Sequence, residues 1–110
     1  MSSEISPYAE IGKHIQFPHP NGIVIGYGVV IKDNVTIFQQ VTLGAQGGAQ
    51  STNKEYPIVG NGVKIYTKAS VIGSAHIGDN CIIGAHALVI KDADENSTYV
   101  GIPAKKVSNV

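Results

Sequence analysis

The sequence predicts an all-β fold, a solenoid in which short strands wind into triangular coils. Two features of the residue pattern indicate this fold. Large apolar residues recur at every sixth position through nearly the whole chain, and a second, often smaller apolar residue follows four positions after most of them. A period of six fits neither the 3.6 residues of a helical turn nor the simple two-residue alternation of a strand. It fits a triangular coil with six residues per side, in which the large residue points inward and the smaller one packs inside the next corner.

The repeat runs in three blocks, and we expect a short strand at each large residue. The large residues are Ile5, Ile11 and Phe17, then Ile25, Ile31, Ile37 and Leu43, then Val59, Ile65, Val71, Ile77, Ile83 and Val89. The smaller residues are Ala9, Ile15, Val29, Val35, Val41, Val63, Ala69, Ala75, Cys81 and Ala87. The alternative fold, an antiparallel sandwich, predicts strands at roughly 8 to 12 residue spacing with irregular loops. The strict period argues against it.

Two stretches interrupt the period. The first is a two-residue shift at His19 to Gly22, and the second is the polar segment GAQGGAQSTNKEYPIV that begins at Gly44. Inserted loops lie on the outside of a solenoid and often carry function, and we expect Tyr56 and Pro57 to anchor the return of this one. The prediction is a single domain, residues 1–110, with an inserted loop at about 45–58 and a C-terminal cap at about 98–110.

Composition predicts few partners. The formal net charge is zero, so the chain has no broad electrostatic footprint for nucleic acid or an anionic membrane. The single cysteine, Cys81, cannot form an internal disulfide, no signal-peptide pattern opens the chain, and the apolar stretches are far shorter than the ~20 residues of a membrane span. We expect a cytoplasmic protein that neither spans a membrane nor binds nucleic acid.

Four motifs together resemble the catalytic domain of serine acetyltransferases, from about Glu4 to Val107. They are HPNGIVIG at 19–26, VTLGA at 41–45, YPIVGNGV at 56–63, and the segment from 62 to 107 that ends in GIPAKKV. The resemblance implies a left-handed parallel β-helix of the hexapeptide acyltransferase type, usually a homotrimer, with acetyl-CoA bound in clefts between neighbouring subunits. It implies acetyl-CoA as the acyl donor and no metal.

The resemblance assigns catalysis to His19, with Glu4 in the place of an aspartate that orients the imidazole fifteen positions later. A neutral imidazole can accept the proton of a hydroxyl as its oxygen attacks a thioester, and can return that proton to the departing thiolate. A carboxylate on the other ring nitrogen would fix the tautomer and favour the imidazolium. Taken without the resemblance, a histidine between Pro18 and Pro20 also fits an exposed turn residue.

A zinc site is a distant alternative. His14 and His19 are five residues apart, a spacing used by related β-helices of the γ-class carbonic anhydrase type. A catalytic zinc site needs three protein ligands, and no third histidine lies upstream. We expect His14, His76 and His86 at outward or corner positions.

The resemblance also implies coenzyme-binding residues in several coils. A backbone N–H near Ala45 is expected to stabilise the thioester oxygen as it gains negative charge. Small residues in successive coils would line the pantetheine channel, the segment GIPA would lie near the adenine, and Lys105 or Lys106 would meet phosphates as flexible point charges. The assigned residues are Gly44, Ala45, Thr67, Ala85, Ile102, Pro103, Ala104 and Lys105. The alternative is that these are corner residues required by the coil and a chain end that caps it.

The acceptor positions depart from the family. Pro18 stands where the family has an aspartate, and Glu55 and Tyr56 stand where it has an Arg-His pair that helps hold the amino acid. Glu55 would repel a carboxylate, whereas Tyr56 offers an aromatic face and a hydroxyl suited to a sugar. The chain end SNV lacks the isoleucine by which the family binds cysteine synthase, so we expect no such complex.

We therefore predict a CoA-dependent O-acetyltransferase that acts on a sugar or glycoconjugate precursor. Serine is the main alternative acceptor. A β-helix that has lost catalysis and serves as a binding or assembly module is a further alternative.

Overall fold

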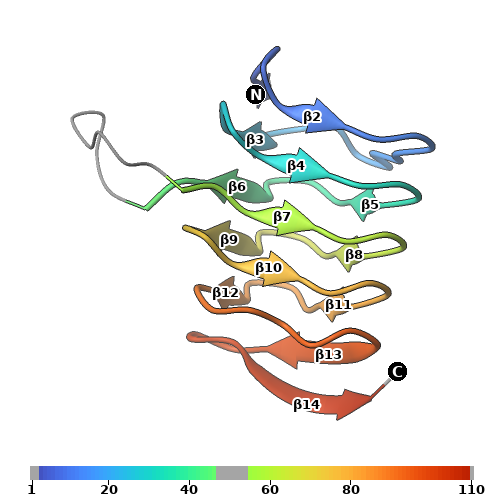
Figure 1. The fold of residues 1–110 in the computed structure, drawn as a ribbon, viewed down its shortest axis with the longest axis vertical. Coiled ribbons are helices and arrows are strands. Elements are labelled where there is room, and N and C mark those ends of the chain that lie inside the picture. Colours follow the sequence, from blue (N-terminus) through green and yellow to red (C-terminus); the bar gives the residue numbers. More distant parts are fainter. Residues whose placement is uncertain (1–2, 47–54, 110) are drawn as a thin grey trace.

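The computed structural model describes residues 3–46 and 55–109, and these residues form a solenoid with three walls (Figure 1). Each wall is a sheet of very short strands. Sheet A contains β1 (Glu4–Ile5), β3 (Val24–Ile25), β6 (Thr42–Gly44), β9 (Ser70–Ile72) and β12 (Leu88–Val89). Sheet B contains β2 (Glu10–Ile11), β4 (Val30–Ile31), β7 (Ile58–Val59) and β10 (His76–Ile77). Sheet C contains β5 (Thr36–Ile37), β8 (Lys64–Ile65), β11 (Ile82–Ile83), β13 (Ser97–Val100) and β14 (Lys105–Asn109).

The strand register confirms the six-residue period. Every described strand pair is parallel except β13 with β14, and the large residue of one coil pairs with the large residue of the next. Sheet A stacks Ile25, Leu43, Val71 and Val89 in this way. Two features stabilise each coil. β-branched and aliphatic side chains fill the interior of the triangle, and the backbone N–H and C=O groups form hydrogen bonds to the neighbouring coils.

The core extends from the second coil to the last. All large and small hexad residues from Ile25 to Val89 are buried. The first coil is different, because Ile5 and Ile11 each remain 41% exposed and Phe17 is only partly buried. Their side chains have a coil on one side only among the described residues, so their burial is set by position in the stack.

Corners are closed by left-handed residues and by a side-chain ladder. Asn34, Asn80 and Asn96 take φ of 61°, 60° and 56°, a conformation that asparagine tolerates better than most residues. Along one edge, the Oδ1 atom of Asp33 accepts the backbone N–H of Lys13 at 2.9 Å, and the same contact recurs from Asn61 to Asp33 and from Asp79 to Asn61. Backbone groups that the corner turns away from the sheets are satisfied in this way.

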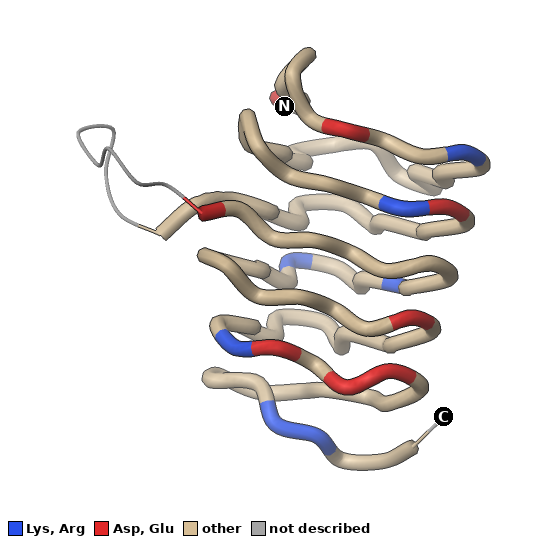
Figure 2. Tube along the Cα trace, in the orientation of Figure 1, with Lys and Arg blue, Asp and Glu red and all other residues tan. Residues whose placement is uncertain are grey.

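The C-terminal segment folds back on the solenoid. Strand β14 runs antiparallel to β13 and is exposed along its length. Positive and negative residues are interspersed along the solenoid (Figure 2). No helix among the described residues is long and apolar enough to cross a membrane.

Candidate active site

His19 stands on an outward bend at one corner of the solenoid. Gln16 still bridges to Thr36, and the carbonyl of Asn21 already accepts the N–H of Gln40 at 2.8 Å, so the residues between them bulge out of the coil. Pro18 and Pro20 lack an N–H and therefore leave no donor unsatisfied in this bend. The His19 side chain is exposed, and its carbonyl accepts the N–H of Asn21 at 2.7 Å. The two-residue shift in the repeat thus presents an imidazole to the outside.

Below His19, the same corner continues through successive coils as an edge between sheets C and A. The carbonyl of Gln39 accepts the N–H of Lys68 at 3.1 Å, and the carbonyl of Thr67 accepts the N–H of His86 at 2.9 Å. Thr67 and Ala85 therefore occupy equivalent positions one coil apart. We call this line, from His19 through Gln39 and Thr67 to Ala85, the His19 edge.

An aromatic pair flanks the His19 edge. The rings of Phe38 and Tyr66 stack with centroids 4.8 Å apart and planes 14° apart. Each residue directly precedes an edge residue, Gln39 or Thr67, and both are only partly buried. Sequence reasoning missed this pair, although the i-to-i+28 match of two aromatic residues at the same hexad position was a signal for it. The pair gives the edge a rigid, apolar side.

At the C-terminal end of the solenoid, Pro103, Ala104 and Lys105 line a hollow of about 300 Å³, whereas the fourth predicted residue of this segment, Ile102, does not. Its lining comprises Val89, Ile90, Lys91, Asp92, Tyr99, Pro103, Ala104 and Lys105. Ile102 is 72% exposed. Lys106 forms an ion pair with Asp94, with Nζ and Oδ2 3.6 Å apart, so it has an anionic partner within the chain. Lys105 and Lys91 are the cations that line the hollow itself.

Gly44 and Ala45 lie elsewhere. Gly44 ends strand β6 and Ala45 follows it, whereas the His19 bend precedes strand β3 of the same sheet, so the width of sheet A separates them from His19. Gly44 is held in the stack, because its carbonyl accepts the N–H of Gly73 at 2.9 Å. A single chain therefore does not bring His19 together with the predicted oxyanion donor.

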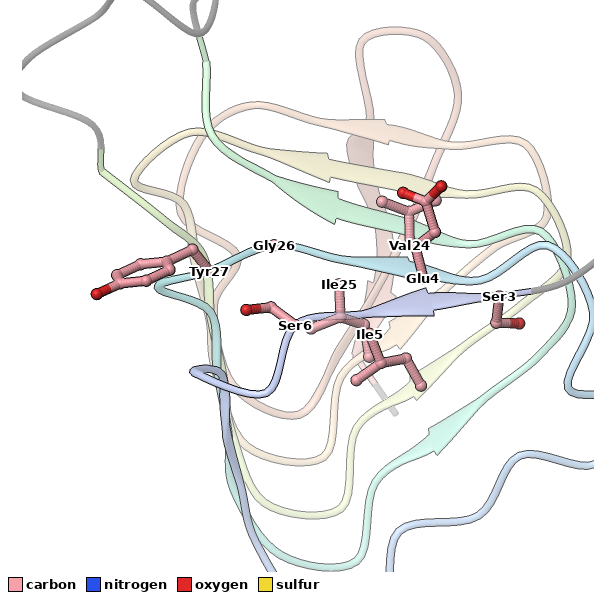
Figure 3. A pocket seen from close by; sticks show the side chains of 8 residues that line it. All are labelled: Ser3, Glu4, Ile5, Ser6, Val24, Ile25, Gly26 and Tyr27. Carbon is pink, nitrogen blue, oxygen red and sulfur yellow. The ribbon is translucent and has the colours of Figure 1, made fainter.

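Glu4 lies on β1, at the edge of a shallow hollow of about 490 Å³ on sheet A. Figure 3 shows its side chain on the same side of the strands as Val24, with Ile5 on the other side. None of the hydrogen bonds or ion pairs found among residues 3–46 and 55–109 joins Glu4 to His19. Their pairing stays a prediction.

Ser3, which sequence reasoning did not single out, ties β1 to the His19 bend. Its Oγ donates to the carbonyl of Pro20 at 3.1 Å and accepts the N–H of Ile23 at 3.1 Å. These two bonds hold the C-terminal end of the bend, from Pro20 to Ile23. Ser3 therefore restrains the backbone that carries His19, and it also places the neighbouring Glu4 on the coil above.

The acceptor positions fall on two corners. Pro18 is exposed beside His19, whereas Glu55 and Tyr56 lie at the corner after sheet A, with Glu55 exposed and the Tyr56 ring partly buried. Pro57 is buried and its carbonyl accepts the N–H of Val30 at 3.1 Å, which confirms the predicted anchoring of the loop's return. Residues 47–54 of the predicted loop lie outside the described residues.

The cysteine and the other three histidines lie away from the His19 bend, in the core, at corners or on a strand. Burial raises the pKa of the Cys81 thiol, which donates to the carbonyl of Asp94 at 2.7 Å. His14 and His86 occupy corners with φ of 60° and 63°, and His76 is exposed on β10. Within the described part of the chain, no group of three or more His, Cys, Asp or Glu residues is arranged to hold a metal ion.

Comparisons with known proteins agree on one family. Residues 56–91 match the family described as bacterial transferase hexapeptide (six repeats). The chain is 41% identical over 109 residues to a serine acetyltransferase of Buchnera aphidicola, which covers 99% of this chain and 39% of that protein. It is 44% identical over 100 residues to one of Staphylococcus aureus, covering 91% of this chain and 46% of the relative.

Solved structures give the same result. A serine acetyltransferase in complex with cysteine superposes with a TM-score of 0.93 at 38% identity, over 98% of this chain and 41% of that one. The enzyme of Neisseria gonorrhoeae gives 0.91 at 36% identity, over 97% and 41%. The chain is a serine acetyltransferase-like hexapeptide-repeat protein.

The likeness confirms the predicted fold and resemblance. The serine acetyltransferase-like chain is a left-handed parallel β-helix, a handedness that the six-residue period by itself does not give. It spans about two fifths of the length of the curated relatives that it matches. The comparisons support the serine acceptor, the alternative in the sequence analysis, and give no support to the predicted sugar acceptor.

Proposed function

We propose that this chain carries the transfer site of a serine O-acetyltransferase, which moves an acetyl group from acetyl-CoA to the hydroxyl of L-serine. The observation that carries the proposal is the His19 edge, with an exposed imidazole at its head and small residues in successive coils below it. The likeness to serine acetyltransferases over 99% of the chain supports it, as does a TM-score of 0.83 to a serine acetyltransferase in complex with CoA.

The proposed reaction assigns a separate task to each part of the site. His19 accepts the proton of the acceptor hydroxyl as its oxygen attacks the thioester carbon, and a C–O bond forms. A backbone N–H near Ala45 stabilises the negative charge on the carbonyl oxygen. The C–S bond then breaks, and the imidazolium returns the proton to the coenzyme thiolate. Thr67 and Ala85 leave room for an extended pantetheine arm, and Lys105 meets the phosphates at the lower hollow.

We propose a homotrimer as the working form. His19 and Ala45 lie at opposite ends of sheet A, so one chain presents two separate halves of the site. A neighbouring copy can supply the missing half to each edge, which makes the cleft between subunits the site of transfer. The acetyl-CoA donor and the buried, unpaired Cys81 suit a reducing cytoplasmic compartment.

A sugar is the second candidate acceptor, and one observation favours it. Glu55 is exposed at the position where the resemblance implies a cation for the serine carboxylate. A neutral pyranose needs no such cation, and Tyr56 offers it a ring and a hydroxyl.

The deciding experiment is thiol release from acetyl-CoA by the purified protein with L-serine and with a panel of sugars and nucleotide sugars. The kcat/KM values at matched, subsaturating acceptor concentrations measure discrimination between acceptors. A larger value for L-serine than for every sugar supports the proposal, and the reverse order replaces serine with a sugar. Thiol release that no acceptor accelerates would contradict both and leave the binding module.

A further inference from the structure

Tyr56 packs into a space that two glycines leave open. A Cβ atom on Gly26 would lie 2.9 Å from Cε1 of the Tyr56 ring, and one on Gly28 would overlap the same ring even more closely. Real Cβ atoms do not approach ring carbons to such distances. The ring therefore lies directly against the backbone of the corner from Gly26 to Gly28, which we call the glycine seat.

The glycines are required for space and not for backbone conformation. Neither Gly26 nor Gly28 has a φ in the left-handed region, so alanine could adopt the backbone angles of both. This differs from Gly73, which touches the departing end of the loop at Gln46 and has a φ of +80°. At the return end of the loop, the absence of two side chains is what admits the tyrosine.

The seat controls where the loop rejoins the solenoid. Pro57 follows the seated ring directly, is buried, and bonds through its carbonyl to the N–H of Val30 at 3.1 Å. Tyr56 and Pro57 are thus both held in place directly before strand β7 begins, and Glu55 precedes them. A displaced ring would move both acceptor positions.

The seat is also one wall of the hollow that contains Glu4. Gly26 and Tyr27 line this hollow together with Glu4 and Ser6, as Figure 3 shows. Tyr27 packs against Tyr8 with ring centroids 4.9 Å apart and ring planes tilted by 35°, so the corner has a second aromatic contact. The Tyr56 ring contacts Gly26 and therefore joins the loop to this wall.

We propose that Gly26 and Gly28 are positioning residues that influence which acceptor is selected. They leave the space in which the Tyr56 ring packs, and this packing fixes Glu55 and Tyr56 beside the transfer site. The inference rests on the proposed function for its consequence in catalysis. The contact itself is a property of the fold and can be tested without turnover.

The first test measures amide hydrogen exchange at Val30 in the wild type, Gly28→Ala, Tyr56→Ala and the double variant. Overpacking by a methyl group or loss of the ring should each speed exchange about tenfold, because both release the Pro57 end of the Val30 bond. In the double variant the methyl group no longer meets a ring, so exchange should match Tyr56→Ala alone. The proposed packing of Tyr56 on the glycines would be refuted if Gly28→Ala exchanged at the wild-type rate. It would also be refuted if the rate increase in the double variant equalled the product of the increases in the two single variants.

The second test measures kinetics of the same proteins and of Tyr56→Phe, which keeps the ring. Gly28→Ala should raise the acceptor KM about fivefold or more while the KM for acetyl-CoA stays within about twofold. Tyr56→Phe should retain wild-type exchange at Val30, because the seated ring is unchanged. Equal losses in both KM values and in kcat would show general destabilisation and overturn the positioning role. If wild type shows no turnover with any acceptor, the exchange result still decides the seat, and only the proposed function fails.

Discussion

The stacking of coils predicts that equivalent isoleucines differ widely in their contribution to stability. Ile65 in β8 is fully buried between Ile37 and Ile83 of the adjacent coils. Ile65→Ala would leave a cavity closed from both sides, and substitutions of this kind cost about 2–5 kcal/mol. We expect a loss of about 3–4 kcal/mol, because parallel strands on both sides restrict collapse of the neighbours.

Ile5 in β1 occupies the same place in the hexad but is 41% exposed, with Ile25 as its partner on one side. A fully buried isoleucine side chain gains about 1.5–3 kcal/mol from leaving water. Roughly three fifths of that gain applies to Ile5, and its removal opens no closed cavity, so Ile5→Ala should cost about 1–2 kcal/mol.

Urea unfolding of both variants, followed by circular dichroism at one matched protein concentration, measures the difference. The m-value should stay constant, so that the shift in midpoint reports stability alone. Equal losses for Ile5→Ala and Ile65→Ala would refute the reasoning. They would mean that Ile5 is covered in solution by another copy or another segment.

Four further predictions concern the site and assembly. His19→Ala should lower kcat by about 10²- to 10⁴-fold, with acetyl-CoA affinity retained in calorimetry and a smaller loss for Glu4→Ala; a full rate in His19→Ala would exclude the general base. Glu55→Arg should raise kcat/KM for L-serine by about tenfold or more, because a cation would replace a like charge at the carboxylate; an unchanged ratio would show that another group holds it. The free energy of unfolding should fall as pH rises past the ordinary thiol pKa, because burial holds the pKa of Cys81 in the folded chain above its unfolded value, so that only the unfolded chain ionises. In urea titrations, Cys81→Ala should lack this part of the decline, and the same decline with pH in wild type and Cys81→Ala would contradict the prediction. Light scattering should report three chains, and a monomer with full turnover would rule out a shared cleft.

The strands were predictable because each coil repeats the contacts of the coil before it. An inward residue such as Leu43 contacts inward residues of the coils above and below it on the same wall, and the next inward residue on a neighbouring wall is six positions away in sequence. Periodicity records contacts of this self-similar kind. It does not record depth in the stack, so Ile5 and Ile65 look equivalent in sequence although their exposure differs.

Contacts that occur once were not predictable in the same way. The anchoring role of Tyr56 followed from its place at the loop's return, but its seat lies 30 and 28 residues earlier, in Gly26 and Gly28, which also fit an ordinary corner. The clamp made by Ser3 is similar, because a serine near the start of the chain has no periodic partner. Such contacts depend on the shape of a particular corner, which the repeat leaves open.

The two breaks in the repeat explain why the proposed site would need more than one chain. A regular corner keeps its N–H and C=O groups in the bonds between coils, so its backbone stays in line with the corners above and below it. The His19 bend escapes this constraint through two prolines before sheet A, and the inserted loop escapes it after sheet A. Both exceptions therefore fall at opposite ends of the same wall. On the proposed trimer, three such walls arranged around an axis place the end of one beside the beginning of the next, and each break in the period completes the site of a neighbouring subunit.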